Sequence, residues 1–540
     1  MTVGALGADL ALRLQFMARS TDVRQQAVAR AARPDYPAWL DHVKAAAACT
    51  RPVRLTGTMA TVDAATGRIL SERHTADLPD GVIYKPCGNR REAVCPACSE
   101  RYKRDAYQVV RSGLVGGKGV PEQVAHHPAV FPTFTAPSFG EVHTRYVERH
   151  TCARRTACDC RPEPCHARRD LTVCPHGVRL ACFARHAETD RNLGTPLCLD
   201  CYDHDSQVVW NLAAGELWRR TTIAINRHIR RVARQRGVAK VPVISPTTGK
   251  LRWVLPLRLS FGKAAEMQRR AVVHFHAIIR LDGFDPNDPD TIVAPPPELD
   301  AADLVAAVEH AAATVGFTTD PHPARRDGWP IRWGEQVLTK VITVAAEGQV
   351  TDAQVAAYLA KYATKSTEAT GHVSGRLTDD TVELYANPHG THVERLVDAC
   401  WRLAHAAWRC PAALCQHHRD CPACAARRAA AATPEPTPYL RLRRWAHMLG
   451  FGGHFLTKSR RYSITFAMLR DQRVTFRRHQ TTGPEQADPT AEPTTLVVNF
   501  LQFVGAGWQT PADAMLANTS AAMAREHQQT AREALQTLAA

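Results

Sequence analysis

One stretch of the chain, residues 272–280, restricts the fold more than any other. It reads Val-Val-His274-Phe-His276-Ala-Ile-Ile-Arg280, and its content of Val, Ile and Phe is typical of a β-strand. Side chains of a strand alternate between two faces, so both imidazoles lie on one face and Phe275 lies on the other. Neutral His is the commonest metal-ligating side chain, so this pair makes half of a metal site. The stretch therefore predicts a sheet that carries a candidate metal centre.

A second stretch, Tyr358-Leu-Ala-Lys361-Tyr362-Ala-Thr-Lys365, is predicted to be a helix. Tyr358 and Tyr362 are four residues apart and share one helix face, with both lysines alongside. A metal that polarises a phosphate, a tyrosine that attacks it and a lysine that offsets the charge would make a DNA strand-transfer site.

Each pattern alone also fits ordinary packing, but their order resembles the HUH family of single-strand endonucleases. The closest resemblance is to the rolling-circle replication initiators of actinobacterial plasmids and integrative conjugative elements. That group places a Phe-x-Thr-x-Thr strand before the His strand and a hydrophobic-x-x-Tyr-hydrophobic-x-Lys helix after it. Here Phe131-Pro-Thr133-Phe-Thr135 matches the first motif, and both tyrosines match the last. The resemblance implies site-specific nicking and rejoining of one DNA strand at an origin through a 5′-phosphotyrosine.

The resemblance also implies roles for the helix residues. Lys361-Tyr362-x-x-Lys365-x-x-Glu368 is similar to the Lys-Tyr-x-x-Lys-Asp-x-Asp motif of a plasmid initiator group, so Tyr362 is expected to be the primary nucleophile. Lys365 would then offset phosphate charge. That group carries a Glu one turn before the tyrosine, where this chain has Tyr358, which resembles the two-tyrosine phage initiators. Tyr358 is therefore either a second nucleophile or a packing residue.

The metal pair needs a third ligand. Glu266, eight residues before His274, is the first choice, and Gln268 and Glu141 are the alternatives. Imidazole and carboxylate ligands together suit Mg²⁺ or Mn²⁺. Such an ion would act as a Lewis acid on the scissile phosphate.

The cysteines predict separate zinc sites. Three Cys-x-x-Cys pairs occur, Cys95/Cys98, Cys198/Cys201 and Cys421/Cys424, and each presents two thiolates to a tetrahedral Zn²⁺ that needs four ligands. The expected structural zinc ligands are Cys87, Cys95, Cys98, Cys174, Cys182, Cys198, Cys201, Cys410, Cys415, Cys421 and Cys424. Cys152, Cys158, Cys160 and Cys165 form a further group, His176 and His186 compete as ligands, and Cys49 and Cys400 stand alone. These sites either staple insertions or form DNA-binding modules.

Charge and composition indicate the partners. A formal net charge of +16 favours an acidic polymer, here origin DNA that is single-stranded or extruded as a hairpin. The sequence has no Gly-x-x-x-x-Gly-Lys-Ser/Thr motif, so a host helicase and polymerase are expected to separate and copy the strands. No apolar run long enough for a membrane span and no secretory signal are found, so a cytoplasmic protein with reduced thiols is expected.

The expected fold class is α+β, with an HUH endonuclease core built on a central antiparallel sheet and interrupted and flanked by Cys-rich zinc-binding modules. The expected domains are residues 1–128, a nicking domain at 129–370 with a Cys-rich insertion at 150–205, a basic region at 371–480, and a linker with a small segment at 481–540. Expected elements include a hairpin at 51–75, helices at 100–114, 208–236 and 301–315, and strands at 251–261 and 271–281. Two alternatives stay open: an HUH relaxase or transposase, and a zinc-stabilised DNA-binding regulator without nicking activity.

Overall fold

The chain forms two compact units, which are described separately. The structure, a computed structural model, describes residues 21–147, 162–168, 172–245, 247–288, 290–342, 351–364, 370, 375–404, 437–482 and 495–539. The terminal unit consists of the residues up to Arg104 and those from Arg470, and the central unit is Asp105–Leu469. Among the described helices, none is long and apolar enough to cross a membrane.

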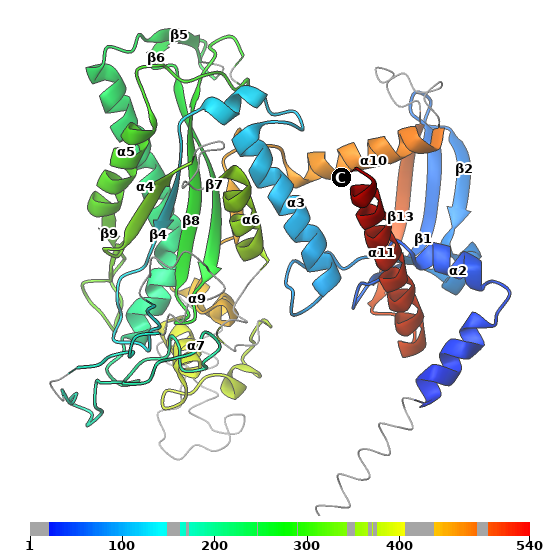
Figure 1. Cartoon of the computed structure of the whole chain (residues 1–540), viewed down its shortest axis with the longest axis horizontal. Coiled ribbons are helices and arrows are strands. Elements are labelled where there is room, and N and C mark those ends of the chain that lie inside the picture. The colour runs from blue at the N-terminus through cyan, green and yellow to red at the C-terminus, as the bar shows by residue number, and fades with distance from the viewer. Residues whose placement is uncertain are drawn as a thin grey trace, which may run out of the picture. The chain divides into compact units, whose positions relative to one another are not determined.

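Figure 1 shows the helices and strands, with labels where there is room. The helices are α2 (Tyr36–Val43), α3 (Pro96–Val115), α4 (His204–Gln235), α5 (Ala301–Thr314), α6 (Asp352–Ala363), α7 (His392–Ala404), α9 (Leu440–Arg444), α10 (Phe466–Thr482) and α11 (Pro511–Ala539). The strands are β1 (Val53–Asp63), β2 (Ile69–His74), β3 (Ile83–Lys85), β4 (Ala129–Phe134), β5 (Val241–Ile244), β6 (Leu251–Val254), β7 (Leu257–Met267), β8 (Val273–Gly283), β9 (Gly316–Thr318), β10 (Pro330–Arg332), β11 (Val337–Val341), β12 (Leu456–Lys458) and β13 (Thr495–Ala506). The expected mixture of helices and antiparallel sheets is confirmed.

A five-stranded antiparallel sheet in the order β11-β4-β8-β7-β12 organises the central unit. Figure 1 labels its strands β4, β8 and β7. Strands β7 and β8 pair along their whole lengths, with Glu266 opposite His274. On the other side of β8, Thr133 of β4 lies opposite His276. The register therefore places the Phe-x-Thr strand beside the His strand.

Helices cover the sheet on both faces. Phe275, Ala277 and Ile279 of β8 pack into the larger core, to which α4 and α5 contribute, whereas Ile278 packs into a second core. That second core contains Leu114 of α3 and Leu359 of α6, together with other residues of the same helices. All of β8 is buried, which explains its nearly continuous apolar sequence.

A buried ion pair lies at the far end of β8. Arg280 and Asp282 are both fully buried, with Arg280 Nε 2.6 Å from Asp282 Oδ1. Ser260 Oγ donates to Asp282 Oδ2 at 2.5 Å, and His127 Nδ1 lies 2.8 Å from Oδ1. Arg280 also donates to the carbonyl of Gly113 in α3. These bonds fix α3 and the segment before β4 on the central strand.

The Cys-rich insertion between β4 and α4 contains isolated bridges such as His166–Cys182 in its described residues. Arg269, in the turn between β7 and β8, donates to the main-chain carbonyls of Glu188 and Asp190. The insertion is thus attached to the turn that precedes the His pair.

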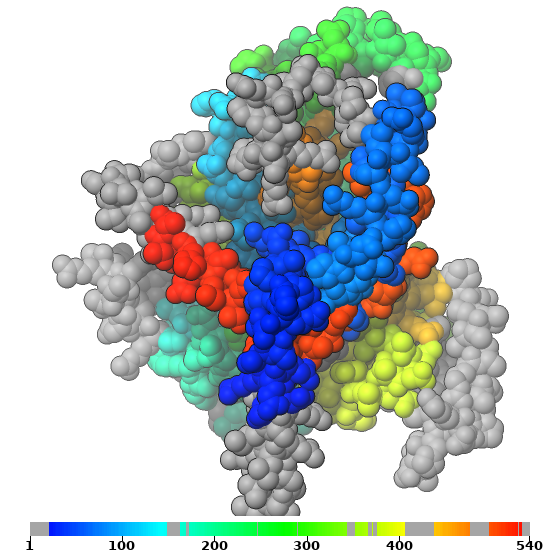
Figure 2. Space-filling view, turned by 90° about the vertical axis from the view of Figure 1, so that its right-hand side faces the viewer, coloured from blue at the N-terminus to red at the C-terminus, as the bar shows by residue number. Residues whose placement is uncertain are grey.

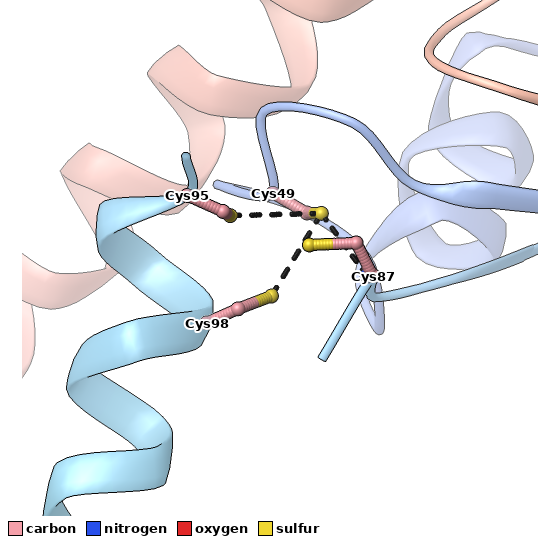
Figure 3. Close-up of side chains that lie close together, drawn as sticks. All are labelled: Cys49, Cys87, Cys95 and Cys98. Carbon is pink, nitrogen blue, oxygen red and sulfur yellow. Dashed lines mark hydrogen bonds between the residues drawn. The ribbon is translucent and has the colours of Figure 1, made fainter. Parts of the chain in front are cut away.

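In the terminal unit, the first and last strands of the chain pair. Strand β1 lies between β13 and the pair β2 and β3, with Val53 opposite Ala506 and Asp63 opposite Thr495. A Cβ at Gly57 would lie 2.0 Å from the carbonyl oxygen of Phe500, so the close approach of β13 requires glycine there. Cys49, just before β1, lies against three other cysteines (Figure 3).

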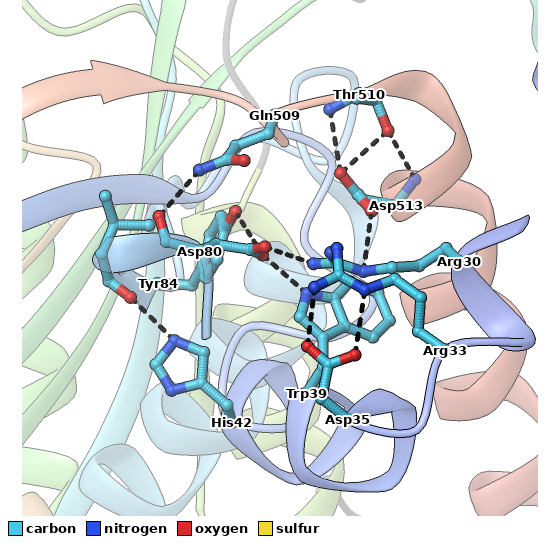
Figure 4. Close-up of polar contacts among 11 residues, drawn as sticks. Arg30, Arg33, Asp35, Trp39, His42, Asp80, Tyr84, Gln509, Thr510 and Asp513 are labelled. Carbon is cyan, nitrogen blue, oxygen red and sulfur yellow. Dashed lines mark hydrogen bonds and ion pairs between the residues drawn. The ribbon is translucent and has the colours of Figure 1, made fainter. Parts of the chain in front are cut away.

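Asp80 connects the two ends of the chain in this unit. It accepts a hydrogen bond from Trp39 Nε1 at 2.6 Å and is paired with Arg30, which also lies 3.6 Å from Asp513 of α11 (Figure 4). Ala517 of α11 belongs to the same core as Trp39. The surface view shows the helices near the N-terminus in blue beside the red C-terminal helix (Figure 2).

Two expectations differ from this arrangement. The boundaries expected near residues 128, 370 and 480 do not coincide with the two units, because β12 pairs with β7, and β13 pairs with β1. The strand expected at 251–261 is two strands, β6 and the start of β7, with Pro256 between them. Proline cannot donate a ladder hydrogen bond, and β6 instead forms a hairpin with β5.

Candidate active site and metal centres

Three strands bring polar side chains to His276. Its Nδ1 lies 3.2 Å from Thr133 Oγ1 of β4, and its Nε2 lies 3.0 Å from Glu266 Oε2 of β7. The ring of His274 is 4.6 Å away, centroid to centroid. Glu266, the expected third ligand, is therefore next to the His pair.

Helix α6 brings both tyrosines to the same place. Thr351 caps this helix through a capping box with Gln354, which fixes where the helix begins. Tyr358 Oη lies 3.4 Å from His276 Nε2, and the ring of Tyr362 stacks on His276 at 5.4 Å. The two tyrosine rings are 4.6 Å apart. The structure thus places both hydroxyl-bearing side chains beside the His pair.

The hydrogen bond between the two tyrosines shifts their pKa values in opposite directions. Burial raises the pKa of Tyr358, and its hydrogen bond with Tyr362 and the negative charge of Glu266 raise it further. The pKa of Tyr362 is also raised, by burial and by the charge and hydrogen bond of Glu266, and the hydrogen bond with Tyr358 offsets part of this increase. The Tyr358 hydroxyl therefore stabilises a phenolate on Tyr362, whereas the same bond disfavours a phenolate on Tyr358.

The His pair and Glu266 fit a divalent cation by chemical type. Burial lowers the pKa of His274 to about 3, so this imidazole is neutral at pH 7 and can act as a ligand. However, the three side chains are not among the described groups whose ligand atoms all lie within 4.8 Å of one another. His274 Nδ1 instead lies 3.4 Å from Gln268 Nε2, which keeps Gln268 near the site.

One alternative ligand has other partners, and two further positions are not described. Glu141 pairs with His166 and Arg168 of the Cys-rich insertion, and its role as an alternative ligand stays a prediction. Lys365 and Glu368 lie outside the described residues. Lys361 is described, and its Nζ lies 5.9 Å from the centroid of the Tyr362 ring.

Three tetrads of side chains have the ligand geometry of a metal centre. They are Cys49/Cys87/Cys95/Cys98 (Figure 3), His143/Cys165/Cys182/His186 and Cys174/His176/Cys198/Cys201, and the ligand atoms within each tetrad all lie within 4.8 Å of one another. Four thiolate or imidazole ligands are what a structural Zn²⁺ requires. The expectation that these cysteine clusters can hold zinc is confirmed for the described residues.

The grouping of the ligands corrects two predictions. Cys49 does not stand alone but completes the tetrad with Cys87, although 38 residues separate them in the sequence. Cys182 does not belong with Cys174 but with Cys165 and two histidines, of which His143 was missed. Neither error could be avoided from spacing, because each new ligand comes from a distant segment without a local motif.

A carboxylate orients one of these histidines. His186 Nδ1 lies 2.7 Å from Asp190 Oδ2, and such a partner directs the other ring nitrogen toward a metal. The Nε2 atom of His186 accordingly lies 3.5 Å from Cys182 Sγ. Cys400 is buried without a metal group among the described residues. Cys152, Cys158, Cys160, Cys410, Cys415, Cys421 and Cys424 lie outside the described residues.

Comparison with known proteins matches most of the chain to one family. A family model described as "Replication initiator protein, pSAM2" (RepSA) matches residues 35–522. A replication initiator protein of Streptomyces ambofaciens is 35% identical over 513 residues, which is 94% of this chain and 94% of that protein. No solved structure matches the chain.

Proposed function

The chain belongs to the RepSA family of replication initiator proteins, and on that premise we propose that it is an HUH-type enzyme that nicks and rejoins one strand of origin DNA. The observation that carries the proposal is the meeting of four elements at His276. Thr133, Glu266 and Tyr358 all lie within 3.4 Å of its ring nitrogens. Ordinary core packing does not require hydroxyl, carboxylate and imidazole groups to meet on one sheet face.

Tyr362 is the nucleophile in this proposal. Its phenolate oxygen attacks the scissile phosphorus, the bond from phosphorus to the 3′ oxygen breaks, and the 3′ oxygen takes a proton. The product is a 5′-phosphotyrosine and a free 3′-hydroxyl, and attack by a 3′-hydroxyl reverses the step. Tyr358 donates a hydrogen bond to the Tyr362 oxygen during the first cleavage. In the second strand transfer, the Tyr358 oxygen accepts the DNA strand. Mg²⁺ or Mn²⁺ held by His274, His276 and Glu266 supplies Lewis-acid polarisation of the phosphate when bound.

The other expected components follow from this role. Zn²⁺ in the three tetrads would staple segments that bury little apolar surface. The net charge of +16 would attract the phosphates of origin DNA without reading its sequence. Lys365 would offset phosphate charge, and a host helicase and polymerase would act on the free 3′ end.

A nicking assay on supercoiled plasmid with the cognate origin tests the proposal. Tyr362→Phe should lose the covalent protein–DNA adduct, because Phe keeps the ring and lacks the oxygen. Tyr146→Phe is the matched control, since Tyr146 is 65% exposed and distant in sequence from α6. The double change His274→Ala and His276→Ala should abolish nicking and preserve DNA binding, which depends mainly on Lys and Arg contacts. Full nicking by that double variant in chelator would refute the metal assignment, and binding without nicking by the unaltered chain would indicate a regulator.

A further inference from the structure

The central unit contains a cavity that the nicking chemistry does not use. This cavity of about 480 Å³ lies between α4, the hairpin β5–β6 and the start of β7. Its lining includes Leu257, Arg258 and Phe261 of β7. Arg258 and Glu266 are eight residues apart on one strand, which corresponds to roughly 26 Å. The cavity therefore lies far along the sheet from the tyrosines.

The lining of this cavity combines positive charge with apolar walls. Three arginines, Arg230, Arg258 and Arg461, contribute to it, and none of its lining residues is Asp or Glu. The Arg258 guanidinium lies over the ring of Phe284, 5.5 Å from its centroid. Most of the exposed surface of the wall is apolar. Such a lining suits a ligand with one flat apolar part and one anionic part.

Arg230 and Arg461 use only part of their hydrogen-bonding capacity within the protein. Arg461 Nε donates to Asp290 Oδ1 at 2.7 Å, and Arg230 Nη2 donates to the carbonyl of Leu257 at 3.2 Å. A guanidinium has five N–H donors, so these bonds leave donors available. Burial lowers the pKa of Arg258 and the neighbouring positive charge of Arg461 lowers it further, whereas the negative charges of Asp282 and Asp290 raise it. A phosphate that reaches both Arg258 and Arg461 would accept charge-assisted hydrogen bonds from the two guanidinium groups.

We propose that this cavity binds one nucleotide of single-stranded DNA, with the base against Phe261 and Phe284 and the phosphate on Arg258 and Arg461. Stacking of bases on aromatic rings within a basic groove is the usual way in which proteins hold single strands. The choice of DNA rests on the proposed function.

Binding is measured in the Tyr362→Phe background, so that the DNA stays intact. Fluorescence anisotropy of a labelled twelve-nucleotide thymidine strand is followed over a salt series. The double change Arg258→Gln and Arg461→Gln should weaken binding about 10-fold. It should also reduce the slope of the logarithm of the binding constant against the logarithm of the salt concentration by about 0.7 for each phosphate that is no longer neutralised. Phe284→Leu should weaken binding about 10-fold with the slope unchanged. Arg227→Gln is the matched control, because Arg227 is an exposed arginine of α4 outside the cavity lining.

Cross-linking with a 5-iodouracil strand locates the contact independently of affinity. Adducts on peptides that contain Phe261 or Phe284 support the proposal. Equal affinity of the double variant and Arg227→Gln, with adducts elsewhere, overturns it. Free thymidine 5′-monophosphate is the second arm: if it fills the cavity and the strand does not, the site is for free nucleotides and the DNA assignment is wrong. The two proposals can fail separately. If the unaltered chain does not nick DNA, but the cavity variants bind the strand more weakly than the Tyr362→Phe protein does, the nicking proposal is wrong and the cavity proposal is supported.

Discussion

Replacing Tyr358 by Phe should slow the first cleavage without abolishing it. Tyr358 is hydrogen-bonded to Tyr362 and favours its phenolate, while its own ring packs edge-on against His276 at 4.8 Å. The substitution keeps the ring and removes the donor. It also removes the oxygen that would accept the strand in the second transfer, so release of the displaced circle should stop.

The size of the first effect follows from the bond and its exposure. A hydrogen bond to a charged group contributes about 1.5–3 kcal/mol, which corresponds to about 10- to 150-fold in rate. Tyr358 is 37% exposed, so water can replace part of the missing bond. We therefore expect the lower end, a decrease of about 10-fold in the rate constant of first cleavage.

The assay uses a single-stranded oligonucleotide that carries the nick sequence. Single-turnover formation of the covalent adduct on a denaturing gel gives the first rate constant, and addition of a second strand with a free 3′-hydroxyl measures rejoining. Tyr362→Phe should give no adduct, and mass spectrometry should find the 5′-phosphoryl group of the unaltered chain on Tyr362. An adduct on Tyr358 alone, or a Tyr358→Phe variant that completes both steps at the normal rate, would refute the reasoning.

Three further predictions concern the metal tetrads and the buried ion pair of β8. Cys49→Ser should lower the zinc content measured by elemental analysis by one ion per chain, whereas Cys400→Ser should leave it unchanged, because Cys49 belongs to a tetrad and Cys400 does not. Asp190→Asn should weaken metal binding at its tetrad by about 10- to 100-fold in a chelator competition, because it removes the partner that orients His186. Asp282→Asn should lower the free energy of unfolding at pH 7 by about 3–5 kcal/mol in denaturant titrations, because Arg280 stays buried without its counter-charge. Burial tends to raise the pKa of Asp282, but hydrogen bonds from His127 and Arg280 lower it overall. The contribution of the Asp282 carboxylate to stability is therefore present above about pH 4 and is lost as the pH falls below that value. At such low pH the free energy of unfolding of the variant should approach that of the unaltered chain.

Local patterns in the sequence were sufficient for several elements. The alternation around His274 predicts β8, and the turn-rich segment from Asp63 to Gly67 predicts the hairpin of β1 and β2, both of which are present. In that turn the Asp63 side chain accepts from the backbone of Thr66 at 2.8 Å. Such features depend on neighbouring residues, so a single sequence contains them.

Non-local pairing could not be predicted in the same way. Nothing in the composition of β13 indicates that it pairs with β1, and the short strand β12 has too few residues for a period to be recognised. Within the candidate site, the position of Glu266 beside the His pair could be predicted because an antiparallel turn returns it to His274, whereas Cys49 has no neighbouring ligand in the sequence. Sequence spacing predicts contacts made across one turn and fails for those made by separate segments.

The pairing of β1 with β13 has a consequence for synthesis of the protein on the ribosome. Strand β1 ends at Asp63 and its partner begins at Thr495, so at about 5–20 residues per second β1 waits roughly 20–90 seconds for β13. During this interval one edge of β1 is unpaired, and unpaired edges promote aggregation. All four ligands of the Cys49 tetrad have emerged by Cys98. Early zinc binding would therefore hold the nascent N-terminal segment in place. Cells depleted of zinc should yield more aggregated protein, although they can still synthesise the whole central unit.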